Sequence, residues 1–257
     1  LLLELRLNIL DKIVDHFVIV EGNKTWQNNP KELKFDIKKF QKFRNKIIYI
    51  PVTDLPEGQD PYLRENYQRN SILRGIKNAK NDDIILISDL DEIPCPKALK
   101  NFDHKMRYAA FKQMHFYYKF NLQSKNYPYW YGTRVCIKKY LKSPQWLREL
   151  KFKKRPFWRL DKLRLNNIIS DGGWHFCNLK TPEDLLYKYK NLCETNDPIH
   201  FKERIDPKYL QIDEIKKKII VGEDIIGRND NFEKVELDNS FPEYLITNKG
   251  NYKDWII

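Results

Sequence analysis

The sequence predicts an α/β protein in which a mixed sheet is flanked by helices. Short apolar runs with strand character alternate with segments of helical periodicity along the chain. The 257 residues are 41% apolar and 14% aromatic, which is enough to bury a substantial core. No stretch rich in Pro, Gly or Ser marks a boundary, so we expect residues 1–257 to form a single domain.

The first hundred residues are expected to form parallel strands joined by helices. Residues 1–13 carry apolar positions on a helical period, and 15–21 (DHFVIVE) and 46–52 (KIIYIPV) have the character of buried strands. Residues 62–80 are predicted to form one long helix, and 82–94 a strand that ends abruptly in acids. The order strand, connection, strand, helix, strand is typical of a parallel α/β sheet.

The remaining residues are predicted to mix strands and helices in an α+β arrangement. Residues 107–121 are aromatic with a strand pattern, and 132–140 (GTRVCIKKY) continue as another strand. A helix is expected to begin at Thr181-Pro182, because Thr is a good N-cap and Pro suits the first helical position, and to run to about Cys193. A further helix is expected at 207–220.

Charge and apolar patterning exclude several classes of protein. The net charge of +12 favours anionic partners, but it is spread along a chain rich in Lys, Ile and Asn, so we do not expect nucleic-acid binding. No apolar run approaches the roughly 18 residues that cross a bilayer, and Glu4 and Arg6 interrupt the opening apolar stretch. The four cysteines form no C-x-x-C pair, which disfavours a zinc ribbon or a thioredoxin-type site. Isolated buried thiols are expected, with a Cys177–Cys193 bridge as the alternative.

The most informative stretch is Asp89-Leu90-Asp91-Glu92, at the end of the apolar strand. Ligands of open α/β sheets bind at the carboxyl ends of strands. Strand alternation would direct Asp89 and Asp91 to one side, where their oxygens suit Mg²⁺ or Mn²⁺. The alternative is an acidic turn that caps the helix after Pro94.

A D-x-D sequence after an apolar strand serves more than one chemistry. In metal-dependent glycosyltransferases the cation bridges the two phosphates of a nucleotide sugar. Aspartate-nucleophile phosphatases carry D-x-D-x-[TV], and Ile93 occupies the last position here, so the pattern disfavours a phosphatase.

Five motifs in this order resemble glycosyltransferase family 17. They are FVIVEGNKTW (17–26), YLRENYQRN (62–70), ILISDLDEIP (85–94), WYGTR (130–134) and GGWHF (172–176). The resemblance extends from residue 1 to roughly 195, and more weakly to about 247. The combination of D-x-D-E-I-P with G-W-H at this spacing is specific, whereas either motif alone would be weak.

The resemblance implies a GT-A-like fold and an inverting transfer from a nucleotide sugar, with UDP-N-acetylglucosamine the first donor to expect. Residues 1–105 would form the half that binds nucleotide sugar and metal, and 106–257 the half that binds a glycan acceptor. A different nucleotide sugar, or a non-catalytic glycan- or nucleotide-binding module on the same fold, are the alternatives. Mn²⁺ (or Mg²⁺) would be held by Asp89, Asp91 and His175.

Donor contacts are expected from the strand end and from the helix before the D-x-D strand. Glu21 is placed for the uridine or ribose, with a strand-end cap as the alternative. Arg64, Arg69 and Asn70 would contact the diphosphate or ribose together with Asp89, since guanidinium groups suit phosphate, although a solvated helix face also explains them.

Inverting transfer needs a general base for the acceptor hydroxyl. Asp171, before the GGWH loop, is the first candidate, and Glu92 is the second or else supports the metal ligands. Trp130 and Trp174 are expected to stack on acceptor sugars, with core packing as the alternative. The other histidines, His115 among them, are expected to be structural. Few cysteines and the Lys/Ile/Asn bias favour a bacterial or viral cytoplasm over a Golgi lumen.

Overall fold

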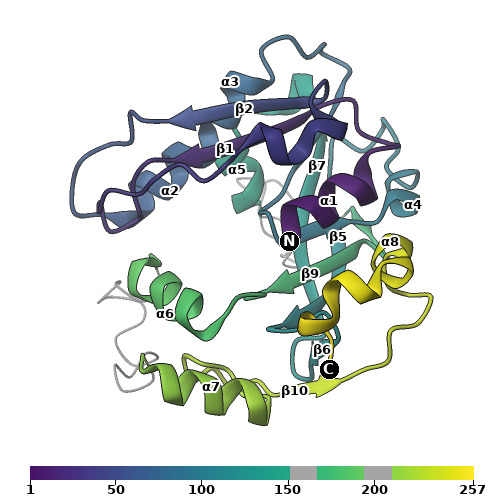
Figure 1. The fold of residues 1–257 in the computed structure, drawn as a ribbon. Helices are drawn as coiled ribbons and strands as arrows, with labels where there is room; N and C mark the ends of the chain where they lie inside the picture. Colours follow the sequence, from purple (N-terminus) through teal and green to yellow (C-terminus); the bar gives the residue numbers. More distant parts are fainter. Residues whose placement is uncertain (151–166, 194–209) are drawn as a thin grey trace, which may run out of the picture.

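Two sheets form the framework of the chain. The computed structural model describes residues 1–150, 167–193 and 210–257, which adopt a mixed α/β fold. The smaller sheet has two parallel strands, and the larger has eight strands that pair mostly in antiparallel fashion. The small sheet lies at one end of the molecule, and the helices α6 and α7 lie at the other (Figure 1). No described helix is long and apolar enough to cross a membrane.

The small sheet pairs β1 (Phe17–Gly22) with β2 (Ile47–Val52), as the apolar runs predicted. The 3-10 helix η1 (Ile37–Phe43) lies in the connection between them. The predicted helix over 62–80 is shorter and broken, because α2 (Pro61–Asn70) is followed by α3 (Ile72–Gly75). Gly75 allows α3 to approach β1 closely, since a Cβ there would lie 2.5 Å from Cγ1 of Val18.

The large sheet takes strands from both halves of the chain. Its path runs β10 (Phe232–Lys234), β6 (Leu122–Ser124), β5 (Tyr108–Tyr117), β7 (Tyr129–Ile137) and β3 (Ile84–Ile87). β9 (Gly173–Cys177) and the short β8 (Ile168–Ile169) run parallel to β5, and β4 (Glu92–Pro94) pairs antiparallel with β9.

The predicted parallel sheet of the first hundred residues is therefore wrong for β3. Among the described residues β3 pairs with β7, in antiparallel register from Ile84↔Ile137 to Ile87↔Arg134. The long antiparallel pair β5–β7 offers the free edge of β7 to β3. A strand's partner from a distant part of the chain leaves no trace in local periodicity, which is why the sequence pattern misses it.

Helices cover the sheets. They are α1 (Leu2–Leu10), α4 (Pro96–Leu99), α5 (Pro144–Glu149), α6 (Pro182–Asn191), α7 (Ile212–Val221) and α8 (Glu243–Thr247), with the 3-10 helices η2 (Lys138–Tyr140) and η5 (Lys249–Trp255). The predicted cap of α6 is confirmed, because the Thr181 hydroxyl accepts a hydrogen bond from the Asp184 amide. The helix predicted at 207–220 is α7, and residues 207–209 of that prediction lie outside the described residues.

Strand alternation on β9 separates the core from the site. Trp174 and Phe176 point into a hydrophobic cluster shared with α1 and α8, where they pack with residues such as Leu5. Because successive side chains of a strand point to opposite faces, His175 and Cys177 lie on the other face. The candidate site described below is built around His175 on that second face.

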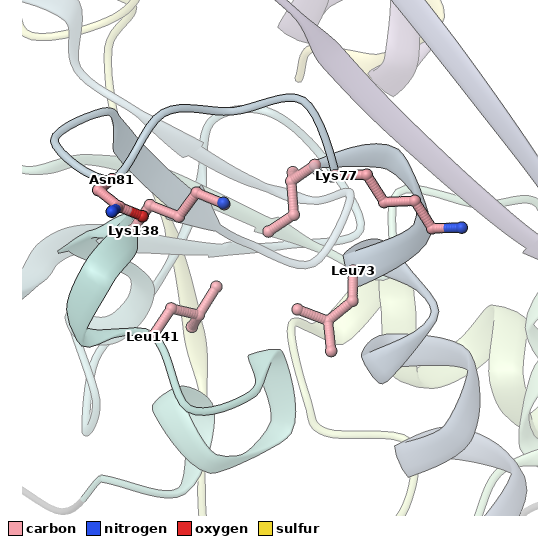
Figure 2. A pocket seen from close by; sticks show the side chains of 6 residues that line it. Leu73, Lys77, Asn81, Lys138 and Leu141 are labelled. Atoms are coloured by element: carbon pink, nitrogen blue, oxygen red, sulfur yellow. The ribbon is translucent and has the colours of Figure 1, made fainter.

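A pocket is lined by side chains of α3 and η2 and of the segments that follow them (Figure 2). Its lining residues are Leu73, Ile76, Lys77, Asn81, Lys138 and Leu141. None of these side chains is a carboxylate, an imidazole or a thiol, so the pocket lacks the groups that metal-assisted chemistry requires. None of the four cysteines is in a disulfide.

Candidate active site

The acidic stretch after β3 is a tight turn. The Glu92 amide donates to the Asp89 carbonyl over 3.1 Å, and the Asp89 amide donates to Oε2 of Glu92 over 3.1 Å. Asp89 and Asp91 are in a turn and not in a strand, so strand alternation does not set the directions of their side chains. The expectation that alternation directs both to one side is therefore wrong. Asp89 and Glu92 meet at one arginine, whereas Asp91 pairs with His175.

That arginine is Arg148 of α5. Its Nη2 donates to Oδ2 of Asp89 at 2.9 Å and to Oε1 of Glu92 at 2.8 Å, and its Nη1 donates to Oε2 of Glu92 at 2.7 Å. Burial raises the pKa of Glu92, but the charge and hydrogen bonds of Arg148 outweigh burial and lower it overall. Glu92 is thus an ionised carboxylate with only 1% exposure, which suits an anchor better than a base.

Two further arginines contact the turn. Arg69 of α2 donates to Oδ1 of Asp89 at 3.3 Å, and Arg6 of α1 donates to the Glu92 carbonyl and, at 3.0 Å, to the Ser88 hydroxyl. Burial lowers the pKa of Arg6 to about 10, so its guanidinium is still charged at neutral pH. The turn therefore combines carboxylates with guanidinium groups that could exchange partners with a bound anion.

Asn70 acts indirectly in this structure. Its side-chain oxygen accepts a hydrogen bond of 3.0 Å from the Gln145 amide, in the first turn of α5. The Ser143 hydroxyl caps the same helix by accepting from the Trp146 amide. Asn70 therefore fixes the helix that carries Arg148, and its predicted contact with a donor stays a prediction.

Asp91 and His175 form the second pair of the site. Oδ2 of Asp91 lies 3.6 Å from Nε2 of His175, and β9 places His175 opposite Glu92 in the register with β4. Burial opposes ionisation of both groups, yet their mutual attraction lowers the pKa of Asp91 and raises that of His175. The metal-free pair is therefore a carboxylate and an imidazolium.

This pair fits the chemistry of a divalent cation. Two ligands at about 2.1 Å from an octahedral ion lie about 3 Å apart, so a small shift would let both atoms bind one cation. Carboxylate oxygen with imidazole nitrogen suits Mn²⁺. Both oxygens of Asp89 are already paired with arginines, so Asp91 and His175 are the better-placed ligands.

Trp130 borders this pair. Its indole Nε1 donates to Oε1 of Glu92 at 2.9 Å, and its ring centroid lies 5.3 Å from that of His175. The residue is 42% exposed, so part of the side chain is accessible to a ligand. Its expected role in acceptor binding stays a prediction that this placement favours.

Trp174 does not share that position, and the expectation that it stacks on acceptor sugars is corrected. Only 6% of its surface is exposed, and its Nε1 donates to the Ser240 carbonyl at 2.9 Å. Alternation along β9 directs Trp174 into the core because its neighbour His175 faces the site.

The expectation that Arg64 contacts the donor is also corrected, since its guanidinium binds groups inside the protein. It is 1% exposed and donates to the carbonyl oxygens of Trp26 and Gly58, each at 2.7 Å. It ties the loops that follow β1 and β2 to α2, whereas Arg69 on the same helix reaches the acidic turn.

The carboxylate of Glu21 is held by the chain segment after β1. It accepts from the amides of Lys34 and Phe35, from Nζ of Lys31 and from the hydroxyl of Tyr49. Burial raises its pKa, but these hydrogen bonds and the Lys31 charge outweigh burial and lower it. The structure thus shows the strand-end alternative, and donor binding by Glu21 stays a prediction.

Asp171 lies in the turn that precedes β9. The register pairs Gly173 with Pro94 and His175 with Glu92, and Asp171 comes two residues before the first of these pairs. It has φ 48° and forms no ion pair or hydrogen bond with a described residue. Its expected role as the base for the acceptor hydroxyl stays a prediction.

Arg148, Arg6 and His115 are site residues that the sequence patterns miss. Arg148 lies on a six-residue helix with no motif, and Arg6 lies on α1, more than 80 residues from its partners. His115 stacks on His175 with centroids 4.7 Å apart and planes 4° apart. The sequence places His115 on a predicted strand, two residues before Tyr117. It does not show that β9 is the neighbouring strand.

The fold and the site together define a mixed α/β protein with a carboxylate–imidazole pair beside an arginine-lined acidic turn, an arrangement suited to a cation and an anionic ligand. The sequence profile described as "Glycosyltransferase family 17" matches residues 1–253, and the chain belongs to this family. The family resemblance carried by the five motifs is confirmed.

Three curated relatives are similar over 218 residues, at 26% identity. They are proteins from Homo sapiens, Rattus norvegicus and Mus musculus, each named beta-1,4-mannosyl-glycoprotein 4-beta-N-acetylglucosaminyltransferase. The match covers 73% of this chain but only 39–40% of each relative. No solved structure matches the chain.

Proposed function

We propose that this chain is a metal-dependent, inverting glycosyltransferase that moves N-acetylglucosamine from UDP-N-acetylglucosamine to a hydroxyl of a glycan. The family and the names of the relatives support the transfer and the choice of sugar. The observation that carries the proposal is the Asp91–His175 pair, 3.6 Å apart, beside the turn that Arg69 and Arg148 line. A GT-A-like arrangement is part of this proposal.

Asp91 and His175 would hold the cation, with Asp89 joining them when an arginine releases one of its oxygens. A cation held by these residues would supply positive charge for the diphosphate that leaves. Arg69 and Arg148 are placed to exchange their carboxylate partners for phosphate oxygens, because a guanidinium binds either anion through two parallel hydrogen bonds.

Glu92 and Trp130 would position these groups. Glu92 holds Arg148 through two oxygens and Trp130 through one, so its charge fixes both side chains. Trp130 would then offer its partly exposed ring, beside His175, for stacking on a sugar. Neither assignment supplies the general base, and the acceptor hydroxyl must deliver its proton to a group outside this set.

The test is release of UDP from a panel of UDP-sugars, with Mn²⁺ or EDTA, for the wild type and Asp91→Asn. Slow donor hydrolysis needs no known acceptor. We expect release that requires Mn²⁺, prefers UDP-N-acetylglucosamine and falls at least about 100-fold in the variant, the loss expected for a transition-state electrostatic contact. Asp54→Asn is the control, because Asp54 is an exposed acid paired with Arg74 on the surface.

Preference for another UDP-sugar would keep the transferase and replace its donor. If no UDP-sugar is hydrolysed, thermal unfolding with UDP and Mn²⁺ decides the matter. A rise in melting temperature that Asp91→Asn abolishes would leave a binding module without turnover. No rise at all would refute the donor site.

A further inference from the structure

A second group of metal-binding atoms lies on the face of the large sheet that carries His175. The parallel register of β5 and β9 pairs His115 with His175 and Tyr117 with Cys177. One donor atom from each of His115, His175 and Cys177 lies within 4.8 Å of the donor atoms of the other two. His115 is 3% exposed, His175 is 7% exposed and Cys177 is half-buried.

In each imidazole, one ring nitrogen has a polar partner and the other has none. Nδ1 of His115 lies 3.1 Å from the carbonyl oxygen of Tyr127, which makes it the protonated nitrogen of the neutral ring. Nε2 of His115 is then a buried lone pair without a hydrogen-bond partner. In His175, Nε2 faces Asp91 and the buried Nδ1 has no hydrogen-bond partner.

This pattern is that of histidine ligands oriented by a second set of residues. Metal-binding histidines almost always donate their other ring N–H to a carbonyl or a carboxylate, which fixes the tautomer and the direction of the ring. The Tyr127 carbonyl and the Asp91 carboxylate occupy those positions here. Buried polar atoms are rarely left unsatisfied, so two such nitrogens beside one thiol require an explanation.

We propose that Nε2 of His115, Nδ1 of His175 and Sγ of Cys177 form a binding site for a thiophilic divalent cation such as Zn²⁺. Two imidazoles and one thiolate match the ligand preference of zinc and not that of Mg²⁺ or Mn²⁺. Three protein ligands leave the fourth tetrahedral position open.

Binding would change protons and ring angles only locally. The cation binds the unprotonated atoms, so it displaces any proton on Nδ1 of His175 and on Sγ of Cys177. Nε2–H of His175 stays directed at Asp91. The rings are 4° from parallel, so their lone pairs converge on one ion only after a tilt about χ2, which is a soft torsion.

The two metals use opposite nitrogens of His175. A neutral imidazole has one lone pair, so a thiophilic ion at Nδ1 and a hard ion at Nε2 are alternatives. The thiophilic site rests on the register of β5 and β9 and on the unpartnered nitrogens, and it does not depend on transfer of a sugar.

The test is titration of the metal-free, reduced chain with Co²⁺, followed by absorption spectroscopy. We expect one equivalent to bind, with a thiolate-to-cobalt charge-transfer band and the intense d–d bands of four-coordinate Co²⁺. Zn²⁺ should abolish these bands at one equivalent, whereas Mn²⁺ at the same concentration should leave them unchanged. This readout is independent of UDP release, so it separates this proposal from the proposed transferase.

Three variants assign the ligands. Cys177→Ser should remove the charge-transfer band, and His115→Gln should weaken Co²⁺ binding at least about 10-fold, as loss of a metal-site residue does. Cys95→Ser is the matched control, a partly buried cysteine outside the cluster, and should bind Co²⁺ as the wild type does. Circular dichroism and urea unfolding establish that each variant is folded.

Three outcomes would overturn the proposal. They are failure of the folded wild type to bind Co²⁺, a charge-transfer band that persists in folded Cys177→Ser, and a band that Cys95→Ser removes as well. If Cys177→Ser does not fold, reaction of wild-type Cys177 with a thiol reagent decides, since Zn²⁺ must protect it. Unchanged labelling with Zn²⁺ would refute the site.

Discussion

Replacing Arg148 by Met isolates the energetic role of the ion pair at the acidic turn. Arg148 forms two hydrogen bonds to Glu92, whose side chain is 1% exposed, and one to Asp89. Methionine fills similar space but leaves the Glu92 carboxylate buried, with Trp130 as its remaining side-chain donor. Removing one partner of a buried ion pair costs about 3–5 kcal/mol, and we expect a loss of that size in the free energy of unfolding at neutral pH.

The cost should depend on pH in a defined direction. In the wild type the pKa of Glu92 is lowered, so the pair contributes stability above the unfolded-state pKa, and this is lost as pH falls through the folded-state pKa. In the variant, burial without Arg148 raises the pKa of Glu92, so the destabilisation appears as pH rises through that value. The two proteins should therefore differ most near neutral pH and converge only below the lowered folded-state pKa of Glu92 in the wild type.

Urea unfolding followed by tryptophan fluorescence measures the difference, at about pH 7 and about pH 5. Arg148→Met/Glu92→Gln should recover much of the loss, because the amide carries no charge. Arg74→Met should change stability much less, since the Arg74–Asp54 pair is exposed. A loss below about 1 kcal/mol for Arg148→Met, or a loss equal at both pH values, would refute the reasoning.

Four further substitutions test burial and packing at residues away from the acidic turn or beside it. Trp174→Ala should lower the free energy of unfolding by about 3–5 kcal/mol. Trp130→Ala, at an exposed ring, should lower it clearly less and should raise the KM for a glycan acceptor. Equal losses in thermal unfolding would contradict the core placement of Trp174. Arg64→Met should lower the free energy of unfolding by about 2–4 kcal/mol, because it leaves carbonyl oxygens unpaired. The Kd of UDP, measured by calorimetry with Mn²⁺, should stay unchanged. A higher Kd in a folded variant would restore Arg64 to the donor site. Gly75→Val should destabilise the packing of α3 on β1, because a Cβ would lie 2.5 Å from Val18, and wild-type stability in urea would show that α3 can move away.

Local patterns determined much of the secondary structure. Apolar runs located β1, β2 and β3, and the Thr181-Pro182 start located α6, since caps and periodicity depend only on neighbouring residues. Local stretches of sequence also contain the acidic residues and the motifs that resemble the family. The profile match confirms this resemblance. The predicted division into residues 1–105 and 106–257 stays a prediction, although one sheet contains strands from both parts.

Only the tertiary structure decided which side chains meet. The register of β9 turned His175 toward Asp91 and Trp174 into the core. Arg148 reaches Glu92 from 56 residues away, and His115 stacks on His175 across 60 residues. A one-residue change of register would reverse the faces of β9, and long-range pairing that sets this register is not written in any local stretch of the sequence.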